Sequence, residues 1–280
     1  MIRVVYYANQ NVGVDCLDVL VKHPEIEIAA VVYLEKEQSE ELQYRSVKEA
    51  AEAADLFLIS CPDRMDDPDF VGQIQSLNAD YGISVAWRKI YHKVNMDVHP
   101  RGIINFHGAY LPNFRGAVPT NWAIMTGKKS TGVSVHFIDE GMDSGPIILQ
   151  EKMKIGDDET GWELRVRQDA LSVKLMGQLA DLITKHDTLP SYPQDLRKGR
   201  AFGIRRPEDG LINFQKSAKE VYNFVRALTK PYPGAFTFIQ GQKLMIWKCE
   251  VVEEKTSEGI YILCGNQKYI RILDAETVSH

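Results

Sequence analysis

Hydrophobic residues in the first half of the chain fall into short runs, separated by segments with helical spacing. The runs are rich in β-branched and aromatic residues, the profile of buried strands, and cover residues 3–8, 26–33, 56–60, 81–86 and 103–106. The segments between them place apolar side chains on one helix face, as Val14, Leu17 and Leu20 do after the first run. This alternation predicts an α/β fold with a doubly wound, Rossmann-like and mostly parallel sheet.

Strand and helix signals continue up to a change in composition. Two more strands are predicted at residues 132–138 and 147–153, and Thr160 with Glu163 forms a capping box that starts a long helix. Residues 185–200 are then rich in Pro, Asp and Lys, which indicates a linker.

The remainder after the linker predicts a smaller α+β domain. Ser217 and Glu220 form a second capping box, which opens a helix to about Leu228. Three β-like runs follow, at residues 235–239, 244–252 and 260–272. We therefore expect one large domain over residues 1–195 and a small C-terminal domain over residues 196–280.

The composition is that of an ordinary soluble globular protein, with 44% hydrophobic and 25% charged residues. No apolar stretch approaches the roughly 20 residues that a membrane span needs. The first apolar run is too short, and too soon followed by amides, for a signal peptide, so we expect a cytoplasmic protein without a membrane partner. The cysteines lie far apart and make no C-x-x-C pair, which indicates reduced thiols; they are Cys16, Cys61, Cys249 and Cys264.

The net charge of −5 is unevenly distributed. Residues 196–280 carry 14 Lys and Arg against 9 Asp and Glu, so the preceding part has 33 − 14 = 19 basic and 38 − 9 = 29 acidic residues. A basic C-terminal part suits nucleic acid or a phosphorylated substrate, although a scattered surplus is more often a solvated surface.

Candidate chemistry concentrates between residues 103 and 147. Asn105 and His107 end a predicted strand, and because they are two apart they point to one face. Asp143 lies between Gly141 and Gly145, which allow the backbone to turn tightly. An amide donor, an imidazole and a carboxylate can together pass a carbonyl group to an amine. None of the three is a strong nucleophile, so direct transfer fits better than a covalent acyl-enzyme.

The same stretch resembles the catalytic core of the folate-dependent formyltransferases. Its motifs read N-F-H, then L-P-x-x-R-G, then H-F-x-D-x-G-x-D-S-G-P-I. The resemblance implies N10-formyltetrahydrofolate as co-substrate and a catalytic role for Asn105, His107 and Asp143. The run R-P-E-D-G-L-I-N-F through P-Y-P-G-A-F also resembles the start of the family's C-terminal domain, with Phe214 where Trp is more usual.

The resemblance further suggests where the folate lies. It places the pteridine ring after the fourth strand, in the region of Trp87, Ile90 and Tyr91, with contacts largely to the backbone. Asp139 is a further candidate for the folate pocket, with a purely structural role as its alternative. His136, His107 and Asp139 match no zinc spacing, so we expect no metal and interpret His136 as a structural residue near the site.

Three other residues are candidates for substrate binding. Asn9 and Asn11 lie in the loop predicted at residues 9–13, after the first strand, where they either form a turn or bind a substrate phosphate or sugar. Arg115 either steadies its loop or contacts the substrate. The first loop lacks G-x-G-x-x-G, which argues against a nicotinamide-dependent oxidoreductase.

Features outside residues 103–147 distinguish between the possible classes of formyl acceptor. Methionyl-tRNA formyltransferases characteristically carry a basic insertion after the second strand, whereas residues 35–45 contain four Glu against one Lys and one Arg, which repel phosphates. The glycine-rich phosphate loop of glycinamide ribonucleotide transformylase is also missing. We therefore expect a nucleotide-linked (dTDP, UDP or GDP) amino-deoxy sugar destined for surface polysaccharide, no nucleic acid partner, and a homodimer. The alternatives are methionyl-tRNA formyltransferase and a non-catalytic folate-binding protein.

Overall fold

The computed structural model describes residues 1–35, 45–256 and 258–278. The chain divides into two compact units, each assembled from three segments. The first comprises Met1–Arg115, Val133–Glu151 and Gln168–Arg200. The second comprises Gly116–Gly132, Lys152–Arg167 and Ala201–His280. The domain boundary expected after residue 195 stays a prediction. The second unit contains two segments that precede this residue in the chain, 116–132 and 152–167.

A seven-stranded sheet forms the centre of the first unit, with the order β3-β2-β1-β4-β5-β7-β8. Its strands are β1 (Ile2–Ala8), β2 (Ile26–Tyr33), β3 (Leu58–Ser60), β4 (Tyr81–Val85), β5 (Ile103–His107), β7 (Ser130–Phe137) and β8 (Ile147–Lys154). The pairs from β3 to β5 are parallel, whereas β7 runs antiparallel to β5. The predicted doubly wound, mostly parallel α/β fold is therefore confirmed.

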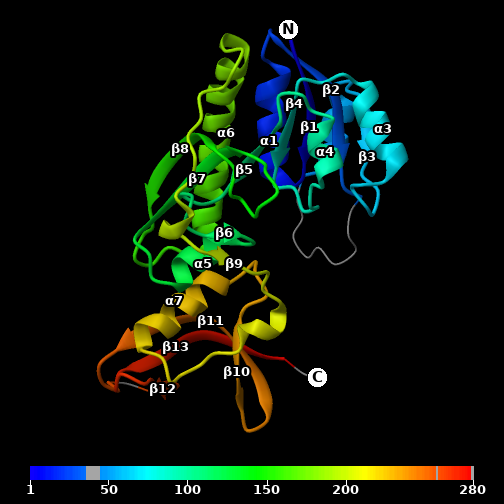
Figure 1. The fold of residues 1–280 in the computed structure, drawn as a ribbon. Coiled ribbons are helices and arrows are strands. Elements are labelled where there is room, and N and C mark those ends of the chain that lie inside the picture. Colours follow the sequence, from blue (N-terminus) through cyan, green and yellow to red (C-terminus); the bar gives the residue numbers. More distant parts are fainter. Residues whose placement is uncertain (36–44, 257, 279–280) are drawn as a thin grey trace. The chain divides into compact units, whose positions relative to one another are not determined.

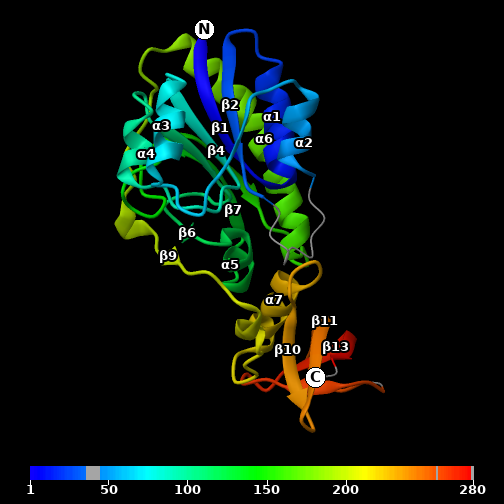
Figure 2. The ribbon, with the colours of Figure 1, turned by 90° about the vertical axis from the view of Figure 1, so that its right-hand side faces the viewer.

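Helices cover both faces of this sheet (Figures 1 and 2). They are α1 (Gln10–Val21), α2 (Val47–Ala53), α3 (Pro68–Ser76), α4 (Lys93–Asp97) and α6 (Gly161–Lys185). Figure 2 shows α3 and α4 on one face and α1, α2 and α6 on the other. Asp67 accepts hydrogen bonds from the backbone N–H groups of Asp69 and Phe70, and Thr160 with Glu163 closes the predicted capping box of α6.

One row of side chains crosses the sheet and changes from apolar to polar. Tyr7 on β1 pairs in register with Ser84 on β4, Ser84 with Asn105 on β5, and Asn105 with His136 on β7. Residues paired in this way project to the same face of a sheet. Tyr7 packs with Phe70 of α3, so the row faces the layer of α3.

Among the predicted boundaries that differ from the structure, three have an evident local reason. Helix α1 begins at Gln10 rather than after residue 13, because the Asn9 side chain caps it by accepting the Gln10 N–H. Gly13 therefore lies inside the helix, where a Cβ on it would come within 3.1 Å of the Ala8 Cβ. The fourth strand ends at Val85, since Ala86 has a φ of 51°. The run at residues 260–272 contains a turn and forms two strands. Most of the acidic stretch at residues 35–45 lies outside the described residues.

The second unit contains a four-stranded antiparallel sheet in the order β10-β11-β13-β12. Its strands are β10 (Ala235–Ile239), β11 (Gln242–Val252), β12 (Tyr261–Leu263) and β13 (Tyr269–Val278). Helix α7 (Ala218–Leu228) packs against β11 and against α5 (Pro119–Met125), and Ser217 with Glu220 forms the predicted capping box. Two short strands, β6 (Arg115–Gly116) and β9 (Ala201–Phe202), form a separate pair. Within the described part of the chain, we find no helix with the length and apolar character of a membrane span.

Candidate active site

Strand β5 presents an amide and an imidazole on one face of the sheet. The Asn105 Oδ1 accepts a hydrogen bond from the Ser84 hydroxyl at 3.0 Å, and its Nδ2 lies 3.2 Å from His136 Nε2. The His107 Nε2 lies 2.8 Å from the carbonyl oxygen of Phe114. Only 7% of His107 is exposed, so the imidazole is held rigidly and away from bulk water.

Asp143 is positioned by a loop that folds back from the end of β7. Because β7 is antiparallel to β5, Phe137 pairs with Ile104 near the start of β5, and the loop must return toward His107. Asp143 itself has a φ of 46°, in the left-handed region. A Cβ on Gly145 would come within 1.9 Å of the Phe137 carbonyl oxygen, so only glycine fits where the loop rejoins the strand.

Two side chains outside the predicted catalytic three hold this loop. The Asp139 Oδ1 accepts hydrogen bonds from the Gly141 N–H at 3.1 Å and from the Ser144 hydroxyl at 2.7 Å. The Gln194 side chain donates to the carbonyl oxygens of Asp143 at 2.9 Å and Gly145 at 2.7 Å. Gln194 comes from the segment interpreted as a linker, which therefore packs onto the first unit instead.

The structure places the Asp143 carboxylate between His107 and His136, and Asn105 joins this cluster through His136. Asp143 Oδ2 lies 3.5 Å from His107 Nδ1, and Asp143 Oδ1 lies 3.6 Å from His136 Nε2. The carboxylate is 19% exposed, so it remains accessible to a substrate. In the described part of the chain, no group of three or more His, Cys, Asp and Glu side chains is arranged to hold a metal ion.

Burial determines the protonation of His107. Loss of hydration lowers the pKa of its imidazole, and the nearby Asp143 carboxylate opposes this shift without overcoming it. The ring is therefore mainly neutral near pH 7. Because the Phe114 carbonyl can only accept, Nε2 carries the proton, and Nδ1 beside Asp143 is the nitrogen that can take up another.

The predicted folate residues have different surroundings. Trp87 and Tyr91 both pack edge-on against Tyr7, with ring centroids 5.6 Å and 5.4 Å from it. Ile90 is 78% exposed. Val85 pairs with Phe106, so the segment that follows β4 starts beside Asn105 and His107. The region is therefore adjacent to the predicted catalytic residues Asn105 and His107. The folate contacts themselves stay a prediction, as does that of Asp139, whose carboxylate is engaged within its own loop.

The residues predicted to bind the acceptor are partly engaged elsewhere. Asn9 accepts a hydrogen bond from the Gln10 N–H at 2.8 Å, and Asn11 accepts one from the Arg45 N–H at 2.7 Å. Asn9 also donates its backbone N–H to Val85, which places it at the edge where β4 ends. The Nε of Arg115 is buried and has no hydrogen-bond partner among the described residues. Their role in substrate binding stays a prediction.

Sequence reasoning did not identify Ser84 or Gln194 and interpreted His136 only as structural. Ser84 had one available signal, a polar residue within the otherwise apolar strand at residues 81–85. Cys61, the only cysteine beside a loop proline, is an unsuitable nucleophile because burial raises the pKa of its thiol to about 11.

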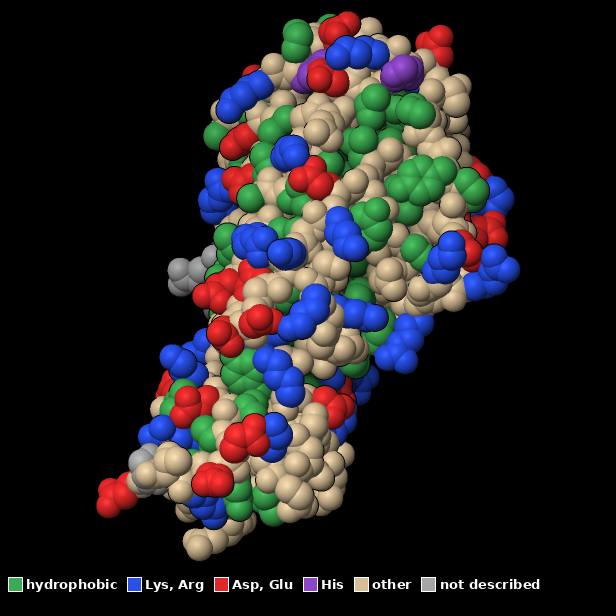
Figure 3. All heavy atoms as spheres, turned by 90° about the vertical axis from the view of Figure 1, so that its left-hand side faces the viewer, with side chains coloured by type: hydrophobic (Ala, Val, Ile, Leu, Met, Phe, Trp, Pro, Cys, Tyr) green, Lys and Arg blue, Asp and Glu red, His purple; other side chains and the backbone are tan. Residues whose placement is uncertain are grey.

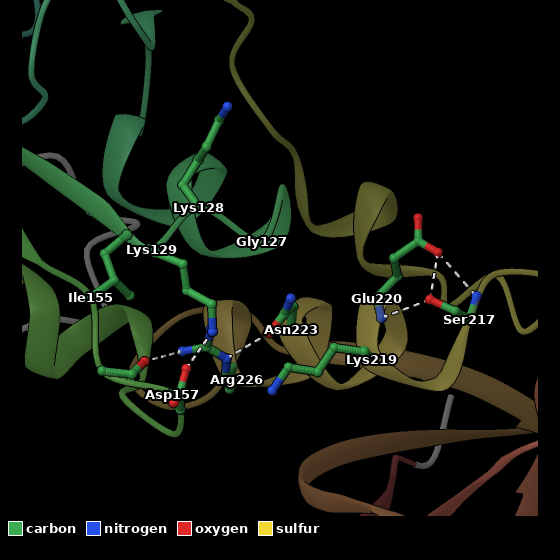
Figure 4. A pocket seen from close by; sticks show the side chains of 11 residues that line it. Gly127, Lys128, Lys129, Ile155, Asp157, Ser217, Lys219, Glu220, Asn223 and Arg226 are labelled. Atoms are coloured by element: carbon green, nitrogen blue, oxygen red, sulfur yellow. Dashed lines mark hydrogen bonds and ion pairs between the residues drawn. The ribbon is translucent and has the colours of Figure 1, made fainter.

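A pocket of about 350 Å³ in the second unit contains different chemistry (Figure 4). Several of its charged groups already have protein partners: Lys129 pairs with Asp157, Glu220 belongs to the capping box, and Arg226 donates to Asn223 and to two loop carbonyls. It contains no histidine and none of the predicted site residues. The chemistry needed for acyl transfer is therefore found in the first unit.

Comparison with known proteins identifies the family. The sequence matches the formyl transferase family over residues 14–179 and the formyl transferase C-terminal domain over residues 205–277. It is 31% identical to the methionyl-tRNA formyltransferase of Acetivibrio thermocellus, over 96% of this chain and 90% of that protein.

Two solved structures share the fold over nearly the whole chain. One is a sugar 3N-formyltransferase solved in the presence of dTDP and 5-N-formyl-THF, with a TM-score of 0.72, 17% identity and coverage of 100% of this chain and 99% of that one. The other is the N-formyltransferase of Helicobacter canadensis in complex with folinic acid and dTDP-3-aminofucose, with a TM-score of 0.72, 19% identity and coverage of 97% and 99%. From the sequence match over more than half its length, this chain belongs to the formyl transferase family.

Proposed function

We propose that this protein transfers a formyl group from N10-formyltetrahydrofolate to the amine of a nucleotide-linked amino sugar. The observation that carries the reaction is the cluster of Asn105, His107 and Asp143, with the imidazole and the carboxylate 3.5 Å apart. The family supplies the formyl donor. A different observation, the negative charge of residues 35–45, supports the acceptor.

The reaction needs one bond made, one bond broken and one proton moved. The neutral amine attacks the formyl carbon, and the carbonyl electrons move to oxygen. Asn105 donates an N–H to this oxyanion, an interaction worth about 3 kcal/mol in the transition state. Asp143 accepts the proton that the attacking nitrogen loses. The carbon–N10 bond then breaks, and the proton returns through Asp143 and His107 to N10, giving tetrahydrofolate and the N-formyl sugar.

The acidic stretch after β2 supports a small acceptor over a nucleic acid. Residues 35–45 contain four Glu and two basic residues, and residues 1–195 as a whole carry 10 more acidic than basic residues. Binding to a polyanion requires cationic side chains that release counterions from its phosphates. A nucleotide sugar carries only a diphosphate and needs few such contacts.

A second candidate is the formylation of methionyl-tRNA. It is favoured by the 31% identity to the Acetivibrio thermocellus enzyme over most of both chains. The two solved structures named above are 17% and 19% identical and support the fold only. The two candidates share the donor and the catalytic residues, so they differ in the acceptor alone.

The test presents both acceptors to the same protein. Purified protein is mixed with N10-formyltetrahydrofolate and either a panel of dTDP-, UDP- and GDP-linked amino sugars or aminoacylated initiator tRNA. We expect tetrahydrofolate release and a gain of one formyl group with a nucleotide sugar. Formylation of the tRNA alone would replace the first candidate by the second.

Variants of the three residues test the site itself. Asn105→Ala, His107→Ala and Asp143→Ala should each lower kcat at least a hundredfold, as loss of a transition-state donor or proton acceptor does, with KM for both substrates largely kept. Near-normal turnover of the His107 variant would contradict the assignment.

A further inference from the structure

His136 occupies a position that a merely structural histidine would not need. It lies on β7 directly opposite Asn105, is 1% exposed, and its ring is edge-on to that of His107 with centroids 6.4 Å apart. Its Nε2 is within 3.6 Å of two of the three predicted catalytic side chains, Asn105 and Asp143.

Hydrogen bonding fixes which nitrogen of His136 carries its proton. The Nδ1 lies 2.8 Å from the Phe137 carbonyl oxygen, which can only accept, so Nδ1 is the donor. In the neutral ring Nε2 is then an acceptor. The donor it meets is Asn105 Nδ2, at 3.2 Å.

This acceptor determines how the Asn105 amide is turned. On the other side, the amide oxygen receives the hydroxyl proton of Ser84 at 3.0 Å. A flipped amide would set its oxygen against the lone pair of His136 Nε2, whereas the Ser84 hydroxyl can donate or accept and so tolerates either orientation. His136 thus selects one orientation, in which one N–H of Asn105 is used and the second remains for a ligand.

The same nitrogen also faces the proton acceptor of the reaction. His107 Nδ1 and His136 Nε2 are the two ring nitrogens without a carbonyl partner, and both face Asp143, at 3.5 Å and 3.6 Å. Because Asn105 takes the single lone pair of His136 Nε2, the imidazole acceptor for a protonated Asp143 is His107 Nδ1.

We propose that His136 is a positioning residue for formyl transfer, which orients the Asn105 amide toward the oxyanion. The inference rests on the proposed function for the identity of the reaction. It assigns to His136 a contact with Asn105 that no apolar residue can replace.

Two substitutions separate the hydrogen bond from the volume of the ring. His136→Leu removes the acceptor, and His136→Gln places an amide oxygen near the position of Nε2. We expect His136→Leu to lower kcat about tenfold to a hundredfold with KM within about twofold, because a misplaced catalytic group costs turnover more than binding. His136→Gln should restore most of kcat.

A matched control is His99→Leu. His99 is also buried, at 3% exposure, and bonds to the Tyr7 hydroxyl at 2.9 Å without touching a catalytic residue. Its loss should lower the thermal midpoint yet keep kcat within about threefold, the size expected away from the reacting groups. Equal losses of kcat in the two Leu variants, or no loss in His136→Leu, would overturn the proposal.

Nuclear magnetic resonance supplies a readout that does not depend on turnover. In ¹⁵N-labelled protein, His136 should show the Nδ1–H tautomer, and the Asn105 side-chain amide signals should move in His136→Leu and return in His136→Gln. An Nε2–H tautomer or unmoved Asn105 signals would refute the positioning role. If the wild-type protein formylates neither acceptor, the proposed function fails, and these signals still decide the role of His136.

Discussion

At the residue scale, the pH dependence of turnover follows from the burial of His107. Loss of hydration moves the pKa of its imidazole below the ordinary value of 6.5. If proton transfer needs an unprotonated Nδ1, kcat stays constant down to about pH 6.5 and falls only as the pH drops through the lowered pKa. Measuring kcat at saturating substrates avoids the titration of the free amine. An acid limb of kcat centred above pH 7 would contradict this assignment.

A second residue-scale prediction concerns the stability contributed by His99. Burial lowers the pKa of its ring from 6.5 to about 4. Between these two values the unfolded chain binds a proton that the folded chain does not, so the free energy of unfolding falls as the pH falls from 6.5 toward 4 and is fully kept above 6.5. The loss from this group between pH 7 and pH 5 should be about 2 kcal/mol.

Urea unfolding of wild-type protein and His99→Gln at both pH values measures this loss. The variant loses the titratable group, so its stability should change less between pH 7 and pH 5, even though it is less stable at pH 7. Parallel pH dependences of the two proteins would exclude His99 as the source.

At the element scale, the loop between β7 and β8 decides whether Asp143 reaches His107. Gly145→Ala would push a Cβ against the Phe137 carbonyl oxygen and displace the loop. We expect a loss of kcat of about a hundredfold, as for a misplaced catalytic group.

Gly72→Ala in α3 is the matched control, since no heavy atom lies within 4 Å of its added Cβ. This variant should keep kcat and gain up to about 1 kcal/mol of stability. Normal turnover of Gly145→Ala would show that the loop tolerates the change.

The same element shows how far sequence reasoning reaches. The two-residue spacing of Asn105 and His107 predicted their shared face, and the flanking glycines predicted a tight turn at Asp143, because both depend on local geometry. His136 acts through a cross-strand pair, and Gln194 reaches the loop from 49 positions away along the chain. Contacts of this kind depend on strand order and chain return, which periodicity does not encode.

At the scale of the whole molecule, charge separates the two acceptor candidates. The net charge is −5, and acidic and basic side chains are interspersed on the face drawn in Figure 3. The most acidic stretch of the sequence relevant to the acceptor is the run of Glu after β2, much of which lies outside the described residues. Replacing Glu37, Glu40 and Glu41 by Lys changes the net charge from −5 to −5 + 6 = +1, and replacing them by Gln changes it to −5 + 3 = −2.

These two variants test whether the acidic run excludes nucleic acid. We expect wild-type protein and the Gln variant to bind tRNA weakly at low salt, and the Lys variant to bind it more tightly, with an affinity that drops steeply between about 50 and 200 mM salt as counterion release requires. Formylation of a nucleotide sugar should stay within about twofold in all three proteins, because a diphosphate releases few counterions. Tight, salt-dependent tRNA binding by the wild-type protein would mean that the acidic run does not repel RNA, and would move the acceptor to methionyl-tRNA.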